Sequence, residues 1–307
     1  MTGKTKIGLI GCGRWGRNIL RDLLVCGCDV YVAEHGESGR IYALDIGAKA
    51  AFAEYTEFPD ALDGYVVAVQ TDRHFDMLKR LAPTGKPIFI EKPMVPDRVH
   101  ALEIQALMGE RVFVMHKWRY HPGIQMLRTL NQEGTYGKLH RLTTNRVQWK
   151  QPHDDVDAFW ILMPHDVSIA YHIIDDLPDV KAVQAQIRGN DIHELTAFLG
   201  PEPSVTLSIS DIFPETQRHV IAYFDQAVVS LPDPLSDQLE VRALKEGKPS
   251  DEITSIPIST EFPLLREIKA FIAHVETGAA VGSLVEDEMT MMQCLTEMRR
   301  LAFDTEG

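Results

Sequence analysis

A glycine-rich turn near the N-terminus constrains the fold of this chain more than any other feature. It follows the apolar segment 6–10, precedes a helical pattern over 15–25, and reads Gly11, Cys12, Gly13, Arg14, Trp15, Gly16, which fits G-x-G-x-x-G. In this context the first glycine permits a tight turn, the second lets the backbone approach a pyrophosphate, and the third allows helix and strand to pack closely. The start of the helix adds N–H donors for phosphate oxygens. The motif therefore predicts a dinucleotide-binding βαβ unit.

An acidic residue at the end of the next predicted strand bears on the choice of dinucleotide. Glu34 follows the apolar segment 30–33 and stands 34 − 11 = 23 residues after Gly11. A carboxylate at this place accepts hydrogen bonds from the adenosine ribose diol and repels a 2′-phosphate, which favours NAD. Arg14 and Arg40 are both able to bind a phosphate, so NADP stays open as the second choice.

The first third of the chain alternates short apolar segments with helical patterns. We expect strands at 6–10, 30–33, 65–69, 87–90 and 112–114, and helices at 15–25, 74–81 and 97–108. Continuous apolar strands that alternate with helices indicate a parallel sheet covered on both faces. The predicted first domain is therefore a Rossmann dinucleotide-binding domain over residues 1–118.

The pattern changes after about residue 120. We expect a long alternating strand at 139–149, helices at 124–131, 166–174, 264–275 and 286–302, further strands at 180–187, 195–199, 204–209, 218–224 and 239–243, and loops at 211–216 and 231–237. A run of strands without intervening helices indicates a mostly antiparallel sheet. The predicted fold class is α/β, with a second α/β domain over 119–307 that carries a large, open, mostly antiparallel sheet.

A charged pair ends one strand of the predicted parallel sheet. Glu91 and Lys92 follow the strand 87–90 and precede Pro93. Ligands bind beyond the carboxyl ends of such strands, and a partly desolvated lysine there can exchange a proton with a substrate hydroxyl. On these residues alone, a solvated pair in a surface loop is the stronger interpretation.

Together these motifs resemble the glucose–fructose oxidoreductase/inositol dehydrogenase (Gfo/Idh/MocA) family. The resemblance covers nearly the whole chain and rests on the glycine turn, Thr71 with His74, 85–87, 91–93, 119–122, Gly134, Gly137, 164–166 and 277–278. It implies NAD(P)-dependent oxidation or reduction at a sugar or cyclitol carbon, and a homo-oligomer, dimer or tetramer. It also implies that Lys92 and His165 are catalytic, and that Thr71, His74, Glu91 and Lys92 contribute to the cofactor site.

One branch of this family is more similar still. Trp15, and Trp160 shortly before His165, resemble the pattern of nucleotide-sugar 3-dehydrogenases acting on UDP-N-acetylglucosamine or UDP-uronate. That pattern has an aspartate four residues before the histidine, where this chain has Ile161, which can neither accept a hydrogen bond nor carry a proton. Either Asp157 or Asp166 substitutes, or Lys92 and His165 act alone, or the substrate or the activity has changed.

Aromatic and basic residues after the first domain are candidates for substrate binding. Trp118, Arg119 and Tyr120 follow the strand 112–114, and their planar groups can stack on nicotinamide or a sugar face, with interface packing as the equal alternative. Arg146 and Lys150 have the same parity on the strand 139–149, which predicts that both point to one face. These two and their neighbours can bind a phosphate or carboxylate, and a solvated sheet face is the alternative. The substrate candidates are Trp118, Arg119, Tyr120, Arg146, Trp149 and Asp166.

Charge is distributed unevenly along the chain. The net charge is 31 − 44 = −13, and it divides into 14 − 15 = −1 for residues 1–115, 7 − 1 = +6 for 116–150 and 10 − 28 = −18 for 151–307. The acidic balance argues against a general partner among nucleic acids or anionic membranes, because such binders carry clustered positive charge. The basic segment 116–150 predicts an anionic substrate, such as a sugar nucleotide or a uronate.

Other features concern the compartment and metals. No apolar run approaches the roughly 18 residues that span a bilayer, and the apolar start is too short for a signal-peptide core, so we expect a cytoplasmic protein. Its cysteines, Cys12, Cys26, Cys28 and Cys294, are expected to be reduced. They lack zinc spacing, and His153 to Asp157 reads as a polar loop, so no metal is expected.

The leading hypothesis is a dehydrogenase that transfers hydride between NAD and a ring carbon of a small-molecule sugar, above all a nucleotide-sugar. The first alternative is a nucleotide-binding regulator that has lost catalysis, motivated by Ile161. The second is a reductase of a non-sugar carbonyl or imine.

Overall fold

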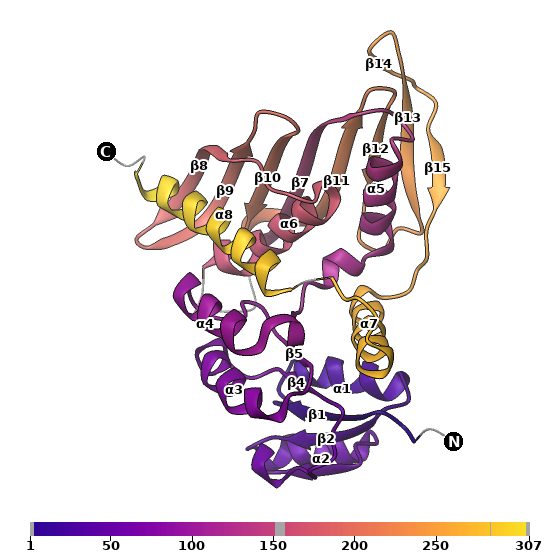
Figure 1. The fold of residues 1–307 in the computed structure, drawn as a ribbon. Helices are drawn as coiled ribbons and strands as arrows, with labels where there is room; N and C mark the ends of the chain where they lie inside the picture. Colours follow the sequence, from indigo (N-terminus) through magenta and orange to yellow (C-terminus); the bar gives the residue numbers. More distant parts are fainter. Residues whose placement is uncertain (1–2, 151–156, 283, 305–307) are drawn as a thin grey trace. The chain divides into compact units, whose positions relative to one another are not determined.

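The chain folds into two compact units. The computed structural model describes residues 3–150, 157–282 and 284–304 (Figure 1). Unit 1 comprises Met1–Lys117 and Phe262–Met289, and unit 2 comprises Trp118–Glu261 and Thr290–Gly307. The first division lies beside the boundary at 118/119 expected from the sequence. The assignment of 262–289 to unit 1 was not anticipated.

Unit 1 is built on a six-stranded parallel sheet with the order β3-β2-β1-β4-β5-β6. The strands are β1 (Lys6–Ile10), β2 (Asp29–Ala33), β3 (Ala50–Phe52), β4 (Gly64–Val67), β5 (Ile88–Ile90) and β6 (Val112–Val114). The central strands β1, β4, β5 and β6 are mostly apolar and buried, as strands with helices on both faces must be, whereas the edge strand β3 is half-buried. This strand order is that of doubly wound dinucleotide-binding sheets, so the predicted Rossmann fold is confirmed.

The helices of unit 1 come from both ends of the chain. They are α1 (Gly16–Val25), α2 (Glu37–Asp45), α3 (His74–Leu81), α4 (Arg98–Met108), α7 (Pro263–Thr277) and the first residues of α8 (Val285–Asp304). Helix α7 joins this unit because its apolar side chains fill the space over β5 and β6. Phe271 stacks on Phe89 with ring centroids 5.2 Å apart and contacts Phe113 edge-on at 6.1 Å. These long-range aromatic contacts, invisible to sequence spacing, account for the unexpected assignment.

Unit 2 contains a nine-stranded sheet with the order β14-β13-β12-β11-β7-β10-β9-β8, in which β15 pairs with β13. The strands are β7 (Leu139–Trp149), β8 (Val180–Arg188), β9 (Asp191–Leu199), β10 (Ser204–Ser210), β11 (Ile212–Phe224), β12 (Ala227–Leu231), β13 (Gln238–Lys245), β14 (Lys248–Pro249) and β15 (Thr254–Pro257). Strands β7 and β10 pair in parallel, and the other pairs are antiparallel. The expected large, mostly antiparallel sheet is confirmed.

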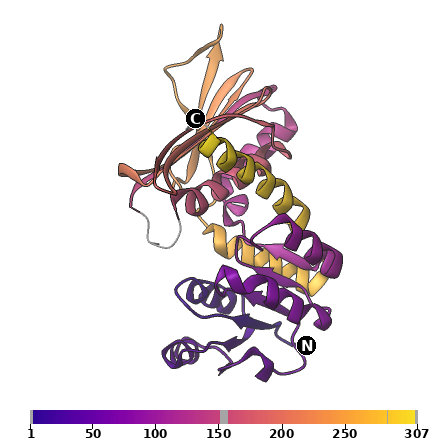
Figure 2. The same cartoon turned by 90° about the vertical axis from the view of Figure 1, so that its left-hand side faces the viewer.

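One face of this sheet is covered by helices. Figures 1 and 2 place α5 (Pro122–Glu133), α6 (Ala158–Ile174) and the later part of α8 on the same side. Alternate strand residues such as Leu142, Leu195 and Val205 point into the core beneath them. Among the described elements of unit 2, no helix covers the opposite face.

Two predicted boundaries in unit 2 are wrong, for local reasons. Helix α6 begins at Ala158 rather than 166, because Asp157 caps it by accepting the Trp160 N–H at 3.2 Å and Pro164 is accommodated inside the helix. The segment 211–216, expected to be a loop, lies largely within β11. The β11–β7 register breaks between Ile212 and Gln217, so this strand contains an irregular stretch that resembles a loop in sequence.

Two expectations from the sequence concern membrane-spanning segments and the state of the cysteines. No described helix combines the length and apolarity needed to cross a membrane. All four cysteines lie in the described part, and none of them forms a disulfide. Burial, which disfavours a thiolate, raises the pKa of Cys12 to about 11.

Truncation of Phe271 tests the role of α7 in unit 1. Phe271→Ala should lower the free energy of unfolding by about 3–5 kcal/mol, because it removes a fully buried ring from the contacts over β5 and β6. Phe262, at the start of the same helix, is 66% exposed, so Phe262→Ala should change stability by no more than about 0.5 kcal/mol. Urea unfolding of both variants provides the measurement, and equal losses would contradict the assignment.

Candidate functional site

The glycine turn adopts the geometry that its sequence predicts. Gly11 has φ +95°, and a Cβ there would lie 2.5 Å from the Ala68 carbonyl oxygen. A Cβ on Gly16 would collide with the Gly11 carbonyl, so the start of α1 can approach β1 only without a side chain. A Cβ on Gly13 would meet no atom within 4 Å, so its backbone is open to a ligand.

The N-terminus of α1 is suited to bind phosphate. Its N-cap, Trp15, makes no side-chain capping hydrogen bond, and no acidic residue occupies the first turn. The N–H groups of the first turn therefore have no side-chain acceptor from the cap, and the positive end of the helix dipole faces the turn. Together with the open backbone at Gly13, these residues fit the pyrophosphate of a dinucleotide.

Glu34 is held beside the turn by backbone donors. Its carboxylate accepts the Cys12 N–H at 2.7 Å and the Gly36 N–H at 3.0 Å. A carboxylate has about four acceptor positions, so two remain for the ribose hydroxyls. Arg40, the candidate partner of a 2′-phosphate, donates instead to the carbonyls of Glu34 and His35 at 2.7 and 2.6 Å. This arrangement fits NAD.

His74 braces the backbone at the edge of the sheet. It is 1% exposed, and its ring nitrogens lie 2.9 Å from the Pro93 carbonyl oxygen and 3.1 Å from the Val69 carbonyl oxygen. Burial lowers the pKa of its imidazole. Because backbone carbonyls lie beside both nitrogens, the ring supports the backbone at the cofactor edge, and its part in the cofactor site stays a prediction. Thr71, at the start of the preceding 3-10 turn, is exposed.

Glu91 and Lys92 follow β5 at the carboxyl edge of the sheet, where the glycine turn also lies. Both side chains are half-buried, and the Glu91 carboxylate accepts the Lys92 N–H at 2.9 Å. Burial raises the pKa of Glu91 to about 7, against the opposing effects of Lys92 and Lys117. A charged pair in this partly desolvated place differs from the solvated surface pair that the local sequence favours.

Three further side chains secure the loop after Lys92, and the sequence analysis missed them. His116 donates its backbone N–H to Glu267 and lies with Nε2 2.7 Å from a Glu288 carboxylate oxygen. The other oxygen of Glu288 accepts the Met94 N–H at 3.4 Å. His116 follows β6, so its place at the edge was predictable, whereas its partners lie more than 150 residues away in sequence.

In unit 2 the structure brings three of the six substrate candidates, Trp118, Arg146 and Asp166, into contact. Trp118 stacks on His121 with centroids 5.4 Å apart, and the Arg146 guanidinium lies 4.5 Å from the Trp118 ring centroid. Arg146 also donates from Nε to Asp166 of α6. Arg119 is buried, with its guanidinium 5.0 Å from the Tyr171 ring centroid. Tyr120, the last residue of the 3-10 turn 117–120, is half-buried.

The absent aspartate of the nucleotide-sugar pattern is not replaced by either acid considered. Ile161 packs against the core of unit 2. Asp157 binds Arg299 at 2.7 Å and caps α6, while Asp166 is 1% exposed and paired with Arg146. Burial raises the pKa of Asp166, although Arg146 opposes this shift. His165 is half-buried on the same helix, α6.

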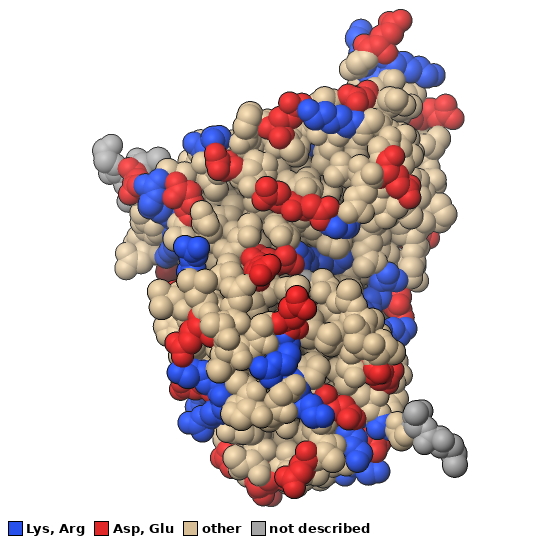
Figure 3. Space-filling view, viewed as in Figure 1, with Lys and Arg blue, Asp and Glu red and all other residues tan. Residues whose placement is uncertain are grey.

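Two other expectations for the basic segment 116–150 are corrected. Strand β7 ends at Trp149, which is 60% exposed, and Lys150 turns away with φ +60°, so the parity that aligned Lys150 with Arg146 does not apply. The basic side chains do not form one surface either, because several pair separately. These pairs are Arg128 with Asp175, Lys138 with Glu202, and Arg146 with Asp166. Figure 3 shows positive and negative side chains interspersed on the visible faces.

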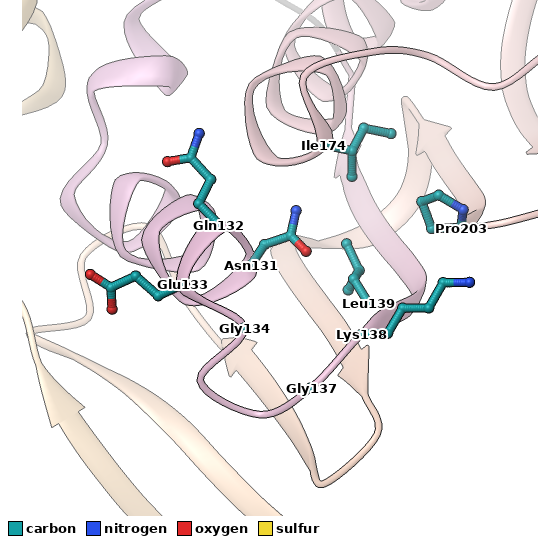
Figure 4. Close-up of a pocket in the computed structure, with 9 residues that line it drawn as sticks. All are labelled: Asn131, Gln132, Glu133, Gly134, Gly137, Lys138, Leu139, Ile174 and Pro203. Carbon is teal, nitrogen blue, oxygen red and sulfur yellow. The ribbon is translucent and has the colours of Figure 1, made fainter.

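A separate hollow of about 390 Å³ lies at the turn between α5 and β7 (Figure 4). None of the site residues predicted from the sequence lines it. Its lining comprises Asn131, Gln132, Glu133, Gly134, Gly137, Lys138, Leu139, Ile174 and Pro203. The two glycines have structural roles here: Gly134 ends α5 with φ +63°, and Gly137 leaves room for the Asp225 carboxylate. Residues 153–156 of the predicted polar loop lie outside the described residues.

The first part of the chain matches a known family. Residues 5–116 match the model of the Gfo/Idh/MocA proteins, described as an oxidoreductase family with an NAD-binding Rossmann fold. These residues are thus similar to the NAD-binding domain of that family. The resemblance predicted from the motifs is thereby confirmed, and the matched family is NAD-binding, as expected.

Similarity to other proteins extends over both units. Inositol 2-dehydrogenase of Rhizobium meliloti (strain 1021) is 26% identical over 321 residues, which cover 94% of this chain and 93% of the relative. The structure of UDP-N-acetylglucosamine 3-dehydrogenase from Acidithiobacillus ferrooxidans superposes with a TM-score of 0.85 at 20% identity, over 98% of each chain. Levoglucosan dehydrogenase in complex with NADH and levoglucosan gives a TM-score of 0.84 at 13% identity, over 98% of each chain. These likenesses show that the two-unit fold is shared.

The raised pKa of Glu91 predicts a pH-dependent stability. A folded-state pKa of about 7, above the ordinary value of 4.5, means that the stabilising contribution is complete below about pH 4.5 and is lost as the pH rises towards 7. Glu91→Gln removes this titration while its amide oxygen still accepts the Lys92 N–H. The melting temperature of Glu91→Gln relative to the parent should therefore be higher at pH 8 than at pH 5.

Thermal unfolding of the protein without added cofactor provides this comparison. Glu110→Gln, at an exposed position of the same unit, controls for the loss of one negative charge. A stability difference between Glu91→Gln and the parent that is equal at both pH values would show that Glu91 does not titrate in this range.

Proposed function

We propose that this protein is an NAD-dependent dehydrogenase that oxidises a secondary hydroxyl group on the ring of a sugar or cyclitol. The observation that carries the proposal is the glycine turn and Lys92 at the same carboxyl edge of the unit 1 sheet, where substrates of such folds bind. The named activities of the three relatives, on inositol, UDP-N-acetylglucosamine and levoglucosan, support this substrate class.

The residues of unit 1 divide the work of cofactor binding. The glycine turn and the start of α1 bind the pyrophosphate, and Glu34 accepts hydrogen bonds from the adenosine ribose. His74 and the His116–Glu288 pair hold the backbone of Pro93 and Met94, directly after Lys92, so that its position is set before substrate arrives. When bound there, NAD would supply the acceptor for the hydride from the ring carbon.

The hydroxyl proton requires a group of this chain. The two candidates are Lys92 of unit 1 and His165 of unit 2. A neutral imidazole accepts a proton directly. A lysine donates a hydrogen bond to the substrate oxygen as the ammonium, and it accepts a proton only as the neutral amine. The pH dependence of turnover in the two variants distinguishes these roles.

Replacement of Lys92 is the central test. Lys92→Met should reduce NADH formation by at least about 100-fold on a panel of UDP-sugars, aldoses and inositols, because it removes a proton-transfer group. His165→Asn should reduce it similarly. Stabilisation by NAD in thermal unfolding should persist in both variants. Lys79→Met, at a surface lysine of the same unit, should retain activity.

A second candidate function is a nucleotide-binding regulator without turnover. The environment of Ile161 favours it, because neither Asp157 nor Asp166 substitutes for the missing acid. The parent protein distinguishes the two functions: NAD stabilisation without turnover of any sugar in the panel would favour the regulator. Full activity of Lys92→Met would instead contradict the catalytic role of Lys92.

We further propose that the protein forms a homo-oligomer, a dimer or a tetramer, through the sheet of unit 2. The face opposite α6 supports this proposal, since it presents Phe198, which is exposed, on a sheet that no described helix covers there. Phe198→Glu should shift the mass measured by light scattering towards that of a monomer. A parent protein that is already monomeric would refute it.

A further inference from the structure

Two arginines face each other across neighbouring strands of unit 2. The antiparallel register of β7 and β11 places Arg218 directly opposite Arg146, and the ion pair of Arg146 with Asp166 shows that this face of the sheet is the one beneath α6. Like charges directly opposite one another in a sheet are destabilising. Two guanidinium groups at this position therefore need compensation from their surroundings.

That compensation is incomplete. Arg146 is 3% exposed and takes the buried carboxylate of Asp166 as its partner. Arg218 is half-buried, and the only hydrogen bond of its side chain within the described part of the chain is a long one of 3.4 Å to the Gln148 side-chain oxygen. Its Nε is buried without a partner among the described residues.

The charges around Arg218 oppose one another. Burial and the neighbouring Arg146 lower the pKa of Arg218, while Asp166 and Asp233 act in the opposite direction. Asp166 is already committed to Arg146, and Asp233 is exposed and makes no ion pair with Arg218. A guanidinium in this position gains most from an anion that reaches it from solution, because an uncompensated charge away from water is costly.

Neighbouring groups hold Arg146 and the loop near Arg218 in place. The Trp118 ring lies beside Arg146 and stacks on His121, whose Nε2 is 2.9 Å from the Pro234 carbonyl oxygen. This bond fixes the loop that contains Asp233. The guanidinium fork binds carboxylate or phosphate through two parallel hydrogen bonds.

We propose that Arg218, supported by Arg146, binds an oxyanion group of the substrate, either the carboxylate of a uronate or the phosphate of a sugar nucleotide. The inference rests on the proposed sugar dehydrogenase and specifies its substrate as anionic. Asp166 follows His165 directly on α6, so the arginine pair is anchored to the same helix that carries the candidate proton acceptor. Arg218 itself was not among the residues singled out from the sequence.

The test compares two anionic probes on protein saturated with NAD, which blocks nucleotide binding at the glycine turn. Glucuronate supplies a carboxylate without phosphate, UDP supplies phosphates without a carboxylate, and glucose is the neutral reference. Thermal stabilisation at increasing probe concentration gives an apparent Kd without requiring turnover. Arg218→Gln should weaken binding of at least one anion about tenfold or more, since hydrogen bonds to charged groups contribute at this level. Glucose should bind the variant and the parent equally.

Two further variants separate recognition from structure. Arg218→Lys should bind the anion with intermediate affinity, because it keeps the charge but loses the fork. Arg141, on the opposite face of β7 with its guanidinium 3.8 Å from the Tyr223 ring centroid, provides the matched control, and Arg141→Gln should bind like the parent. Melting temperatures without probe verify that each variant folds.

The outcomes distinguish this inference from the proposed function. The inference is overturned if neither anion binds the parent, if Arg218→Gln binds both as the parent does, or if it loses glucose and anions equally. Anion binding that depends on Arg218, in a protein that oxidises no sugar, would support the site and refute the dehydrogenase. Turnover of neutral sugars without binding of either anion would do the reverse.

Discussion

The close approach of α1 to β1 is the constraint on which the cofactor site depends. Gly16 lies against the Gly11 carbonyl, and Gly11 lies against the backbone of Ala68, so three segments meet with no side chain between them. This contact brings the start of α1 to the carboxyl edge of the sheet and leaves its first N–H groups without a capping side chain. Glu34 is oriented by the same turn through the Cys12 N–H. A larger residue at Gly16 would therefore disturb both phosphate and ribose recognition.

Buried hydrogen bonds also fix the backbone next to Lys92. His74 connects the segment after β4 with the Pro93 carbonyl, and Glu288 connects His116 with the Met94 N–H. Burying such polar groups costs free energy unless they are hydrogen-bonded. Each of these hydrogen bonds therefore favours one arrangement of the backbone. Glu91 is held in the same region, where burial raises its pKa to about 7. Lys92 thus lies on a loop whose flanking backbone is fixed by side chains from distant parts of the sequence.

Local signals predicted the elements of this fold well, and contacts between distant segments explain what they missed. The strands 6–10, 112–114 and 139–149 and the helix 74–81 were predicted with their observed bounds, because each is a clear apolar pattern. The place of α7 in unit 1 depends on Phe271 meeting Phe89 and could not be seen from spacing. His74 was placed correctly at the sheet edge, but its role required knowledge of the carbonyls around it.

The net charge of the segment 116–150 is a second case in which contacts with distant residues could not be seen from the sequence. Its net value of 7 − 1 = +6 suggested one basic surface, yet strand register and pairing decide where each charge acts. Arg128, Lys138 and Arg146 each have a carboxylate from elsewhere in unit 2. Arg218, in the strongly acidic remainder of the chain, is half-buried and has no such partner among the described residues, and the pairing of β11 with β7 brings it beside Arg146. Affinity for an anion in this unit therefore depends on local pairing rather than on the charge of any sequence segment.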